Sequence, residues 1–191
     1  VVIYGRRRVG KTTLIKEFIK DKPAMYFLAD ERLETIQRRR FQQDLSRFTG
    51  DPLLARVTTG DWDTLFELLI QRVDWSQKVV LVLDEFQYLA KTTPGFPSFI
   101  QGMWDERLRE QNIMLILCGS LVGMMRRLCI DSGSPLYGRR TAQIRLKPFQ
   151  FNDYLDIFDA SFNELVPLYA ISGGVPRYIE LLRPKGEDDL I

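Results

Sequence analysis

Four residues near the start of the chain have the types and the spacing that bind a phosphate group. Gly5, Gly10, Lys11 and Thr12 match the pattern GxxxxGK[ST], with a strand-like stretch before them and an amphipathic stretch after them. Glycines let the backbone curl until its N–H groups converge on phosphate oxygens, and the following helix points its positive dipole end at the same anion. The pattern therefore predicts a phosphate-binding loop.

The side chains of this loop have separable roles. We expect Lys11 to place its charge between the β- and γ-phosphates of a nucleotide, and the Thr12 hydroxyl to ligate Mg²⁺. A chance glycine-lysine turn is the alternative, and the preceding strand and following helix argue against it. The predicted nucleotide-binding residues of the loop are Gly5, Arg8, Val9, Gly10, Lys11, Thr12 and Thr13.

Two acids end an apolar run, VVLVLDE, at residues 79–85. A carboxylate at the carboxyl end of a buried strand lies where α/β proteins bind their ligands. We expect Asp84 to hold Mg²⁺ and Glu85 to orient and polarise an attacking water. An acidic cap before the next helix is the structural alternative. The paired acids, and the lack of an NKxD guanine-reading stretch, favour ATP hydrolysis over a GTPase switch.

A second apolar run, LILCGS, ends at Ser120. The Ser120 hydroxyl would lie near the γ-phosphate if this strand lies between the first and third strands of the sheet. A serine that caps the following helix is an equally good interpretation, and the sequence leaves both open.

Three consecutive arginines, Arg6, Arg7 and Arg8, fill the variable positions of the phosphate loop. Backbone N–H groups make the phosphate contacts in such loops, so the variable side chains project outward. We expect only Arg8 to approach the phosphates. The other two are expected to meet a lid, a partner or a nucleic-acid backbone.

Apolar β-rich runs alternate with amphipathic stretches along most of the chain. Because these runs are unbroken rather than alternating, they predict a parallel sheet of about five strands buried on both faces, in a three-layer α/β domain. The sequence carries Thr64 and Glu67 at the spacing of a capping box. Strands are predicted at 1–4, 24–29, 78–85, 113–120 and 142–146, and helices at 12–21, 34–48, 63–73, 97–110 and 121–128.

Composition excludes several classes of function. The chain has no histidine, which rules out histidine-based metal sites and catalytic triads. Its two cysteines, Cys118 and Cys129, have neither a zinc-binding spacing nor the number of a secreted disulfide framework. A net charge of +2 gives no global case for nucleic acid. The longest apolar run, 113–125, is too short for a membrane span, so we expect a cytoplasmic protein without membrane contact.

Two regions are expected. Residues 1–148 form the nucleotide-binding core, and residues 149–191, where β-rich runs give way to helical patterns, form part of a small helical lid. Because the chain begins inside a predicted strand, we take it to be trimmed at both ends or a piece of a longer protein.

Five segments of the chain, in the same order, resemble the archaeal-type P-loop ATPases. This family belongs to the STAND class of signal-transducing ATPases, among the AAA+-related ASCE NTPases. The segments are GRRRVGKTTLIKEF, LVLDEFQYLA, LCGSLVGMM, SPLYGRRTAQIRLKPFQFNDY and GGVPRYIELL. The resemblance implies a P-loop NTPase fold with sheet order 5-1-4-3-2. The family's N-terminal entry segment and C-terminal winged-helix region have no counterpart in this sequence.

The same resemblance extends the site. It implies a sensor role for Ser120, an adenine-side contact by Pro176 next to Gly174, and a phosphate-chain sensor at Arg177. It also implies that Arg139, or failing that Arg140, reaches a γ-phosphate in its own subunit or a neighbour's. A solvated loop is the alternative for these two arginines.

We therefore expect a slow ATPase that uses ATP and Mg²⁺, with Lys11, Glu85 and Arg139 as catalytic residues and Thr12 and Asp84 as metal ligands. A homo-oligomer or a partner domain would receive the signal. Two alternatives stay open: a nucleotide-gated scaffold with negligible turnover, and the ATPase of a DNA-associated motor or defence system. Nucleic-acid binding is not favoured, because acids flank the arginine cluster at 38–40.

Overall fold

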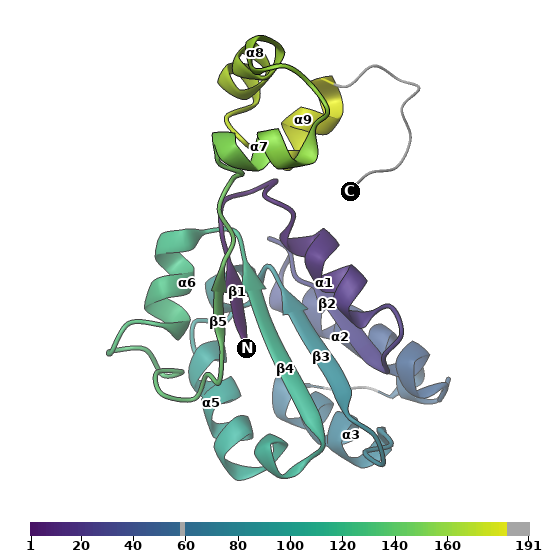
Figure 1. Cartoon of the computed structure of the whole chain (residues 1–191). Helices are drawn as coiled ribbons and strands as arrows, with labels where there is room; N and C mark the ends of the chain where they lie inside the picture. Colours follow the sequence, from purple (N-terminus) through teal and green to yellow (C-terminus); the bar gives the residue numbers. More distant parts are fainter. Residues whose placement is uncertain (58–59, 183–191) are drawn as a thin grey trace.

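A parallel sheet forms the centre of the computed structural model, which describes residues 1–57 and 60–182. The sheet has five strands in the order β2-β3-β4-β1-β5, and every neighbouring pair is parallel. The predicted order and direction are therefore confirmed (Figure 1). The strands are β1 Val2–Tyr4, β2 Ala24–Leu28, β3 Val79–Asp84, β4 Ile113–Gly119 and β5 Gln143–Arg145.

The predicted helices of the core are present with small shifts at their ends. They are α1 Lys11–Ile19, α2 Glu34–Thr49, α3 Trp62–Arg72, α5 Phe96–Glu106 and α6 Val122–Cys129. A further helix, α4 Phe86–Thr92, was not predicted, because it starts directly after the acids that end β3. The expected capping box at Thr64 is wrong: α3 begins earlier, and its N-cap is Asp61, whose carboxylate accepts from the Thr64 N–H at 2.8 Å.

Alternate residues of β3 explain why the sheet carries a helical layer on each side. Every β3 residue is buried. Leu81 and Leu83 belong to a large apolar cluster with side chains from α2 to α6, whereas Val80 and Val82 belong to a second cluster with Ile15 of α1. Both faces of the strand therefore need apolar residues, which is why the run has no polar alternation.

The strand order brings three loops together at one edge of the sheet. β4 lies between β1 and β3, with Tyr4 opposite Gly119 and Leu83 opposite Leu117. Because the strands are parallel, the phosphate loop after β1, Glu85 after β3 and Ser120 after β4 meet at the carboxyl edge. The condition attached to the Ser120 prediction is met.

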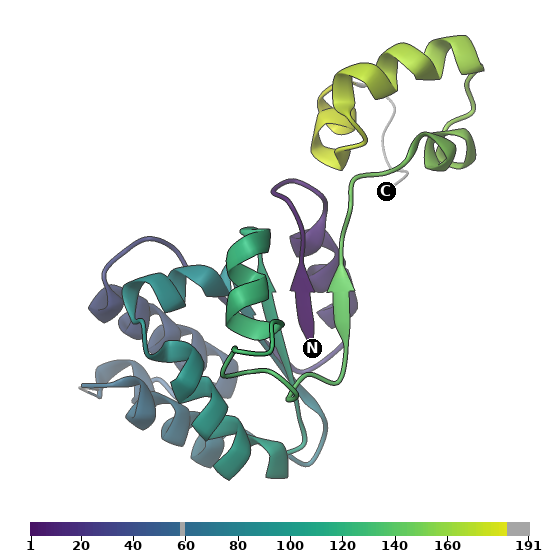
Figure 2. The same ribbon diagram turned by 90° about the vertical axis from the view of Figure 1, so that its left-hand side faces the viewer.

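The described part of the predicted helical lid lies beyond this same edge (Figures 1 and 2). It consists of α7 Phe151–Ile157, α8 Phe162–Ser172 and α9 Pro176–Leu182, which pack around Tyr154, Leu165 and Ile179. The remainder of the predicted lid, 183–191, lies outside the described residues. Among residues 1–57 and 60–182, no helix is both long and apolar enough to cross a membrane.

A glycine fixes the base of the lid to the chain that leaves the core. Gly174 has φ of +74°, and its carbonyl accepts from the Phe149 N–H at 2.8 Å. A Cβ on Gly174 would lie 2.0 Å from the Phe149 carbonyl oxygen, so no other residue fits there without backbone movement.

We expect Gly174→Ala to lower the free energy of local lid unfolding by about 2 kcal/mol, because it adds a backbone collision to the left-handed penalty. Gly173→Ala is the matched control: Gly173 also has positive φ, but nothing lies within 4 Å of its Cβ position. We expect that control to cost about 1 kcal/mol. Hydrogen exchange of α7–α9 amides measures both, and equal losses would contradict the role of the Phe149 contact.

Candidate nucleotide site

The phosphate loop leads directly into α1. Gly10 adopts φ of +91°, a conformation that favours glycine, and α1 begins at the next residue, Lys11. The Lys11 side chain is only 6% exposed, and its Nζ donates to the carbonyls of Gly5 at 2.9 Å and Arg6 at 2.8 Å. In the described part of the chain, Lys11 makes no ion pair with a carboxylate. Its charge is thus held inside the loop by neutral groups, as an anion site requires.

Sterics explain the first glycine of the loop. A Cβ on Gly5 would lie 2.3 Å from the Leu146 carbonyl oxygen, because the chain leaving β5 runs directly against the loop. Val9 is buried, while Thr12 and Thr13 are exposed. Val9 therefore anchors the loop in the core and leaves the α1 side of the loop open.

The predicted metal ligands lie within hydrogen-bonding distance of each other. The Thr12 hydroxyl donates to Asp84 Oδ2 at 3.2 Å, and the Glu85 N–H donates to Asp84 Oδ1 at 2.8 Å. The Tyr26 hydroxyl also donates to Asp84 Oδ2. Burial, together with this hydrogen bond, raises the pKa of Tyr26, so the phenol stays protonated and remains a donor.

This donor set fits Mg²⁺. A threonine hydroxyl and one carboxylate are hard oxygen ligands, and Mg²⁺ is usually held by one or two such groups together with substrate phosphates and water. In the described ranges, no cluster of three or more His, Cys, Asp or Glu side chains could hold a metal ion without such help. The residues therefore suit a metal that arrives with a nucleotide.

The second acid, Glu85, is hydrogen-bonded to Ser120, the residue after β4, and to Gln87 of α4. Its Oε2 accepts from the Ser120 hydroxyl at 2.7 Å, from the Ser120 N–H at 3.3 Å, and from the Gln87 amide. Glu85 has φ of +54°. Arg8 and Glu85 are the non-glycine residues with positive φ in the described parts of the chain, and both belong to the predicted site. Such strain clusters where function constrains the backbone.

Two of the three arginines in the loop, Arg7 and Arg8, contact tyrosines. Arg7 Nη2 donates to the Tyr88 hydroxyl of α4 at 2.5 Å. Arg8 Nη1 lies 3.3 Å from the Tyr178 hydroxyl of α9, and its guanidinium lies 5.4 Å from the centre of that ring. Arg8, which we expected to approach the phosphates, therefore connects the loop to the lid in this structure.

Arg139 lies far from its own phosphate loop, which corrects the expectation of a contact within one subunit. It precedes β5, whose first residue Gln143 pairs with Val2, so it lies at the amino edge of the sheet. Its guanidinium donates to both carboxylate oxygens of Asp105, at 2.9 Å from Nε and 2.6 Å from Nη2. Arg140 lies at the same edge and donates to the carbonyls of Cys129 and Ile130. Contact with a neighbouring copy stays a prediction for Arg139.

The two lid residues expected to meet the nucleotide, Pro176 and Arg177, lie at the start of α9. Pro176 is the first residue of α9. Arg177 is exposed and pairs with Glu180 one turn along the same helix, at 2.7 Å. The structure brings the adjacent Tyr178, rather than Arg177, to the phosphate loop.

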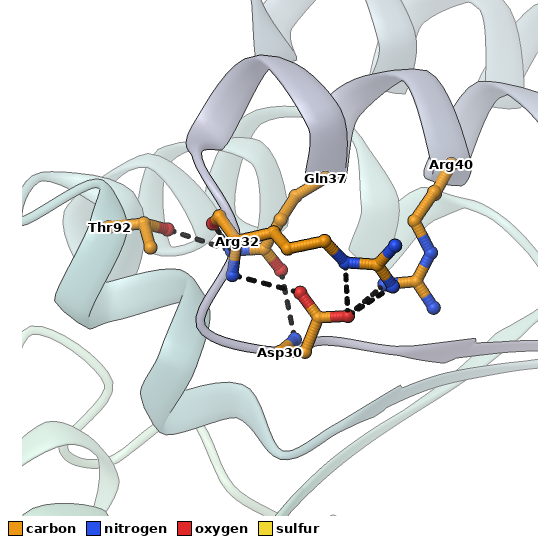
Figure 3. Close-up of polar contacts among 5 residues, drawn as sticks. All are labelled: Asp30, Arg32, Gln37, Arg40 and Thr92. Carbon is orange, nitrogen blue, oxygen red and sulfur yellow. Dashed lines mark hydrogen bonds and ion pairs between the residues drawn. The ribbon is translucent and has the colours of Figure 1, made fainter.

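A polar cluster fixes the loop that follows β2, beside the site (Figure 3). Asp30 accepts from Arg32 and from Arg40, the latter at 2.7 Å, and these contacts, led by the Arg32 hydrogen bond, lower the pKa of Asp30. The buried Gln37 accepts from the Asp30 N–H at 3.3 Å and donates to the Thr92 hydroxyl of α4 at 2.9 Å. The cluster thus ties the end of β2 to the helix that follows Glu85.

Three side chains in contact with the predicted site residues were missed in the sequence: Tyr26, Gln87 and Tyr178. Tyr26 lies in a predicted strand and Tyr178 in the predicted lid, whereas Gln87 lies in α4, which was not predicted. Only the partner across the fold gives each of these side chains a role. For Gln87 a weak signal existed, since a polar residue sits in the apolar stretch after the two acids.

The fold and these contacts define a P-loop ATPase, and comparison with known proteins agrees. The model of a family described as "ATPase domain predominantly from Archaea" matches residues 1–182. The chain belongs to that family. MJECL04, an uncharacterized protein of Methanocaldococcus jannaschii, is 32% identical over 184 residues, which are 96% of this chain and 39% of that protein. The chain therefore spans well under half of that relative.

Solved structures share the fold. The Walker-type ATPase PABY2304 of Pyrococcus abyssi has a TM-score of 0.58 and 21% identity, covering 98% of this chain and 63% of that one. The STAND protein PH0952 of Pyrococcus horikoshii, which has a tetratricopeptide repeat sensor, has a TM-score of 0.59 and 15% identity. That match covers 99% of this chain and 28% of PH0952. The ORC1 protein of Aeropyrum pernix, solved in complex with DNA, has a TM-score of 0.59 and 16% sequence identity. That match covers 95% of this chain and 52% of ORC1.

We expect Tyr26→Phe to weaken nucleotide binding about fivefold in Mg²⁺ and to leave binding in EDTA unchanged. The variant removes one donor to a carboxylate, worth about 1 kcal/mol, and with it the fixed orientation of Asp84. Titration with a fluorescent ATP analogue under both conditions measures the difference. Tyr4→Phe is the control, since the Tyr4 hydroxyl bonds Gln143 on β5. An equal loss in EDTA would contradict a role at the metal.

Proposed function

We propose that the chain is the Mg²⁺-dependent, ATP-hydrolysing domain of a STAND-like regulatory ATPase. The supporting observation is a continuous set of hydrogen bonds at the carboxyl edge of the sheet. It runs from Thr12 through Asp84 and Glu85 to Ser120, beside the buried cation of Lys11. These are the groups needed to bind phosphates, hold a metal and orient a water.

The residues divide this work between them. Loop N–H groups and Lys11 would hold the β- and γ-phosphates, while Thr12 and Asp84 would hold Mg²⁺, which neutralises charge on the phosphate oxygens. Glu85 would orient the attacking water and accept a proton from it, and the Ser120 hydroxyl would donate a hydrogen bond to the γ-phosphate. Oriented groups and fixed charges are what phosphoryl transfer requires, because the protein forms no covalent bond to the phosphate and acts by positioning and charge stabilisation.

The lid contact supports a regulatory role. Arg8 joins the phosphate loop to Tyr178 of α9 through a hydrogen bond and a cation–π contact. A phosphate that attracts Arg8 would compete with this contact, so nucleotide state and lid position would be linked. PH0952 is a STAND protein, and its likeness to this chain adds to the proposal.

The contact between the phosphate loop and the lid also bears on which partners respond to the nucleotide. We propose that a homo-oligomer or a partner domain responds to the lid, and that Arg139 acts on the γ-phosphate bound by a neighbouring copy. Nucleic acid is less favoured, although ORC1 of Aeropyrum pernix was solved with DNA. Arg38 and Arg40 of the basic cluster pair with Glu34 and Asp30, and Arg126 pairs with Asp131, which reduces their availability for phosphates.

We expect Lys11→Ala to weaken ATP binding at least 100-fold, because no other side-chain cation is held inside the loop. Equilibrium binding of a fluorescent ATP analogue in Mg²⁺ measures the loss. Lys16→Ala, an exposed lysine of the same helix, is the control and should bind as the parent does. Equal affinities for all three proteins would place the nucleotide elsewhere.

We expect Glu85→Gln to bind ATP as tightly as the parent does but to release phosphate about 100-fold more slowly, since the amide cannot accept a proton from water. Steady-state phosphate release, with affinity measured in parallel, separates the two effects. Release at the parental rate would overturn the assignment of Glu85. ATP binding without release by the parent would favour the nucleotide-gated scaffold.

A further inference from the structure

We propose that Gln87 is a positioning residue for hydrolysis, one that keeps the Glu85 carboxylate in place while Ser120 turns its hydroxyl to the γ-phosphate. This inference rests on the proposed role of Glu85 as the residue that orients water. It assigns a function to a buried amide on α4 that the phosphate loop and the metal ligands do not explain.

The contacts converge on one oxygen atom. Glu85 Oε2 accepts from the Ser120 hydroxyl, from the Ser120 N–H and from Gln87 Nε2. Oε2 therefore has its hydrogen-bonding capacity filled, and the other carboxylate oxygen is left to accept from a water. The carboxylate is oriented by donors from two places, Ser120 directly after β4 and Gln87 on α4.

Counting hydrogens separates the two donor side chains. The Ser120 hydroxyl has a single hydrogen, so while it donates to Glu85 it cannot donate to a phosphate oxygen. The Gln87 amide has two hydrogens, and its Nε2 reaches both Glu85 and the Ser120 hydroxyl oxygen, the latter at 3.4 Å. When Ser120 donates to phosphate, Gln87 still holds Glu85 and can also orient the serine oxygen as an acceptor.

The orientation of the amide supports this role. Gln87 is fully buried, and its Oε1 has no hydrogen-bond partner in the described residues. Reversing the amide would place that oxygen against the Glu85 carboxylate, so the donor must face Glu85. A residue that only filled this space would be apolar, because a buried acceptor without a partner destabilises the fold.

The neighbouring strand leaves room for the amide. A Cβ on Gly119 would lie 2.3 Å from Gln87 Oε1 and 2.4 Å from the Met125 sulfur. The glycine before Ser120 thus lets α4 place a long polar side chain directly against the end of β4. A side chain at position 119 would therefore collide with the Gln87 amide in its present position.

The test is a double-mutant cycle. Gln87→Met keeps the length of the side chain and removes its donors, and it is made alone and together with Glu85→Gln. ATP affinity and single-turnover phosphate release in Mg²⁺ are measured on each protein. We expect Gln87→Met alone to release phosphate about tenfold more slowly, with ATP affinity within twofold of the parent. In the Glu85→Gln background it should cause no further loss.

A buried glutamine elsewhere provides the matched control. Gln42 of α2 is also buried, and its amide donates to the carbonyls of Leu54 and Val57, away from the site. Gln42→Met should lower the melting temperature and leave phosphate release per folded molecule unchanged. If Gln87→Met does not fold, as judged by circular dichroism, Gln87→Asn replaces it, because the shorter side chain keeps its polarity but withdraws the donor from Glu85.

Four results would overturn the proposal in distinguishable ways. No loss in Gln87→Met alone, or an equal loss in both backgrounds, would show that Gln87 does not act through Glu85, while the proposed function would stand. Phosphate release at the parental rate by Glu85→Gln alone would instead contradict the role of Glu85 and, with it, this inference. If the parent releases phosphate no faster than Lys11→Ala does, hydrolysis is rejected, and with it the roles assigned to Glu85 and Gln87.

Discussion

The buried carboxylate of Asp84 is the constraint on which the site depends. Asp84 is 1% exposed at the end of a strand with apolar clusters on both faces, so its charge must be compensated by hydrogen bonds rather than by water. Donors come from Thr12 at the start of α1, Tyr26 on β2 and the backbone of Glu85. Each of these belongs to a different element. Satisfying one carboxylate therefore fixes α1, β2 and the start of α4 relative to β3.

The same constraint explains the strained backbone at Glu85. The chain must leave β3 with the Glu85 N–H directed back at Asp84, and then begin α4 immediately. A left-handed residue makes that reversal in one step, and it turns the Glu85 side chain toward Ser120. The strain is thus part of how two carboxylates on adjacent residues, the proposed metal ligand Asp84 and the proposed water-orienting Glu85, have different partners.

Much of this arrangement could be predicted because it is local in sequence. The phosphate loop is one turn between a strand and a helix, and the paired acids end a single apolar run, so spacing alone identifies Lys11, Thr12, Asp84 and Glu85. Tyr26 and Gln87 could not be found in this way. Tyr26 is one aromatic in a strand where aromatics are common, and Gln87 acquires a partner only when β4 is placed beside β3. The sheet order came from family resemblance, not from the residues themselves.

Two arginines of the phosphate loop connect the anion site to other parts of this protein. Phosphate binding in such loops uses backbone N–H groups, so the side chains at the variable positions can change without loss of the anion site. Here Arg7 contacts α4, which follows Glu85, and Arg8 contacts α9 of the lid. Both contacts use tyrosine hydroxyls, which bind a guanidinium without neutralising it. A negative phosphate can therefore compete for Arg8, whereas a carboxylate partner such as Asp105, which holds Arg139 with two oxygens, would resist that competition.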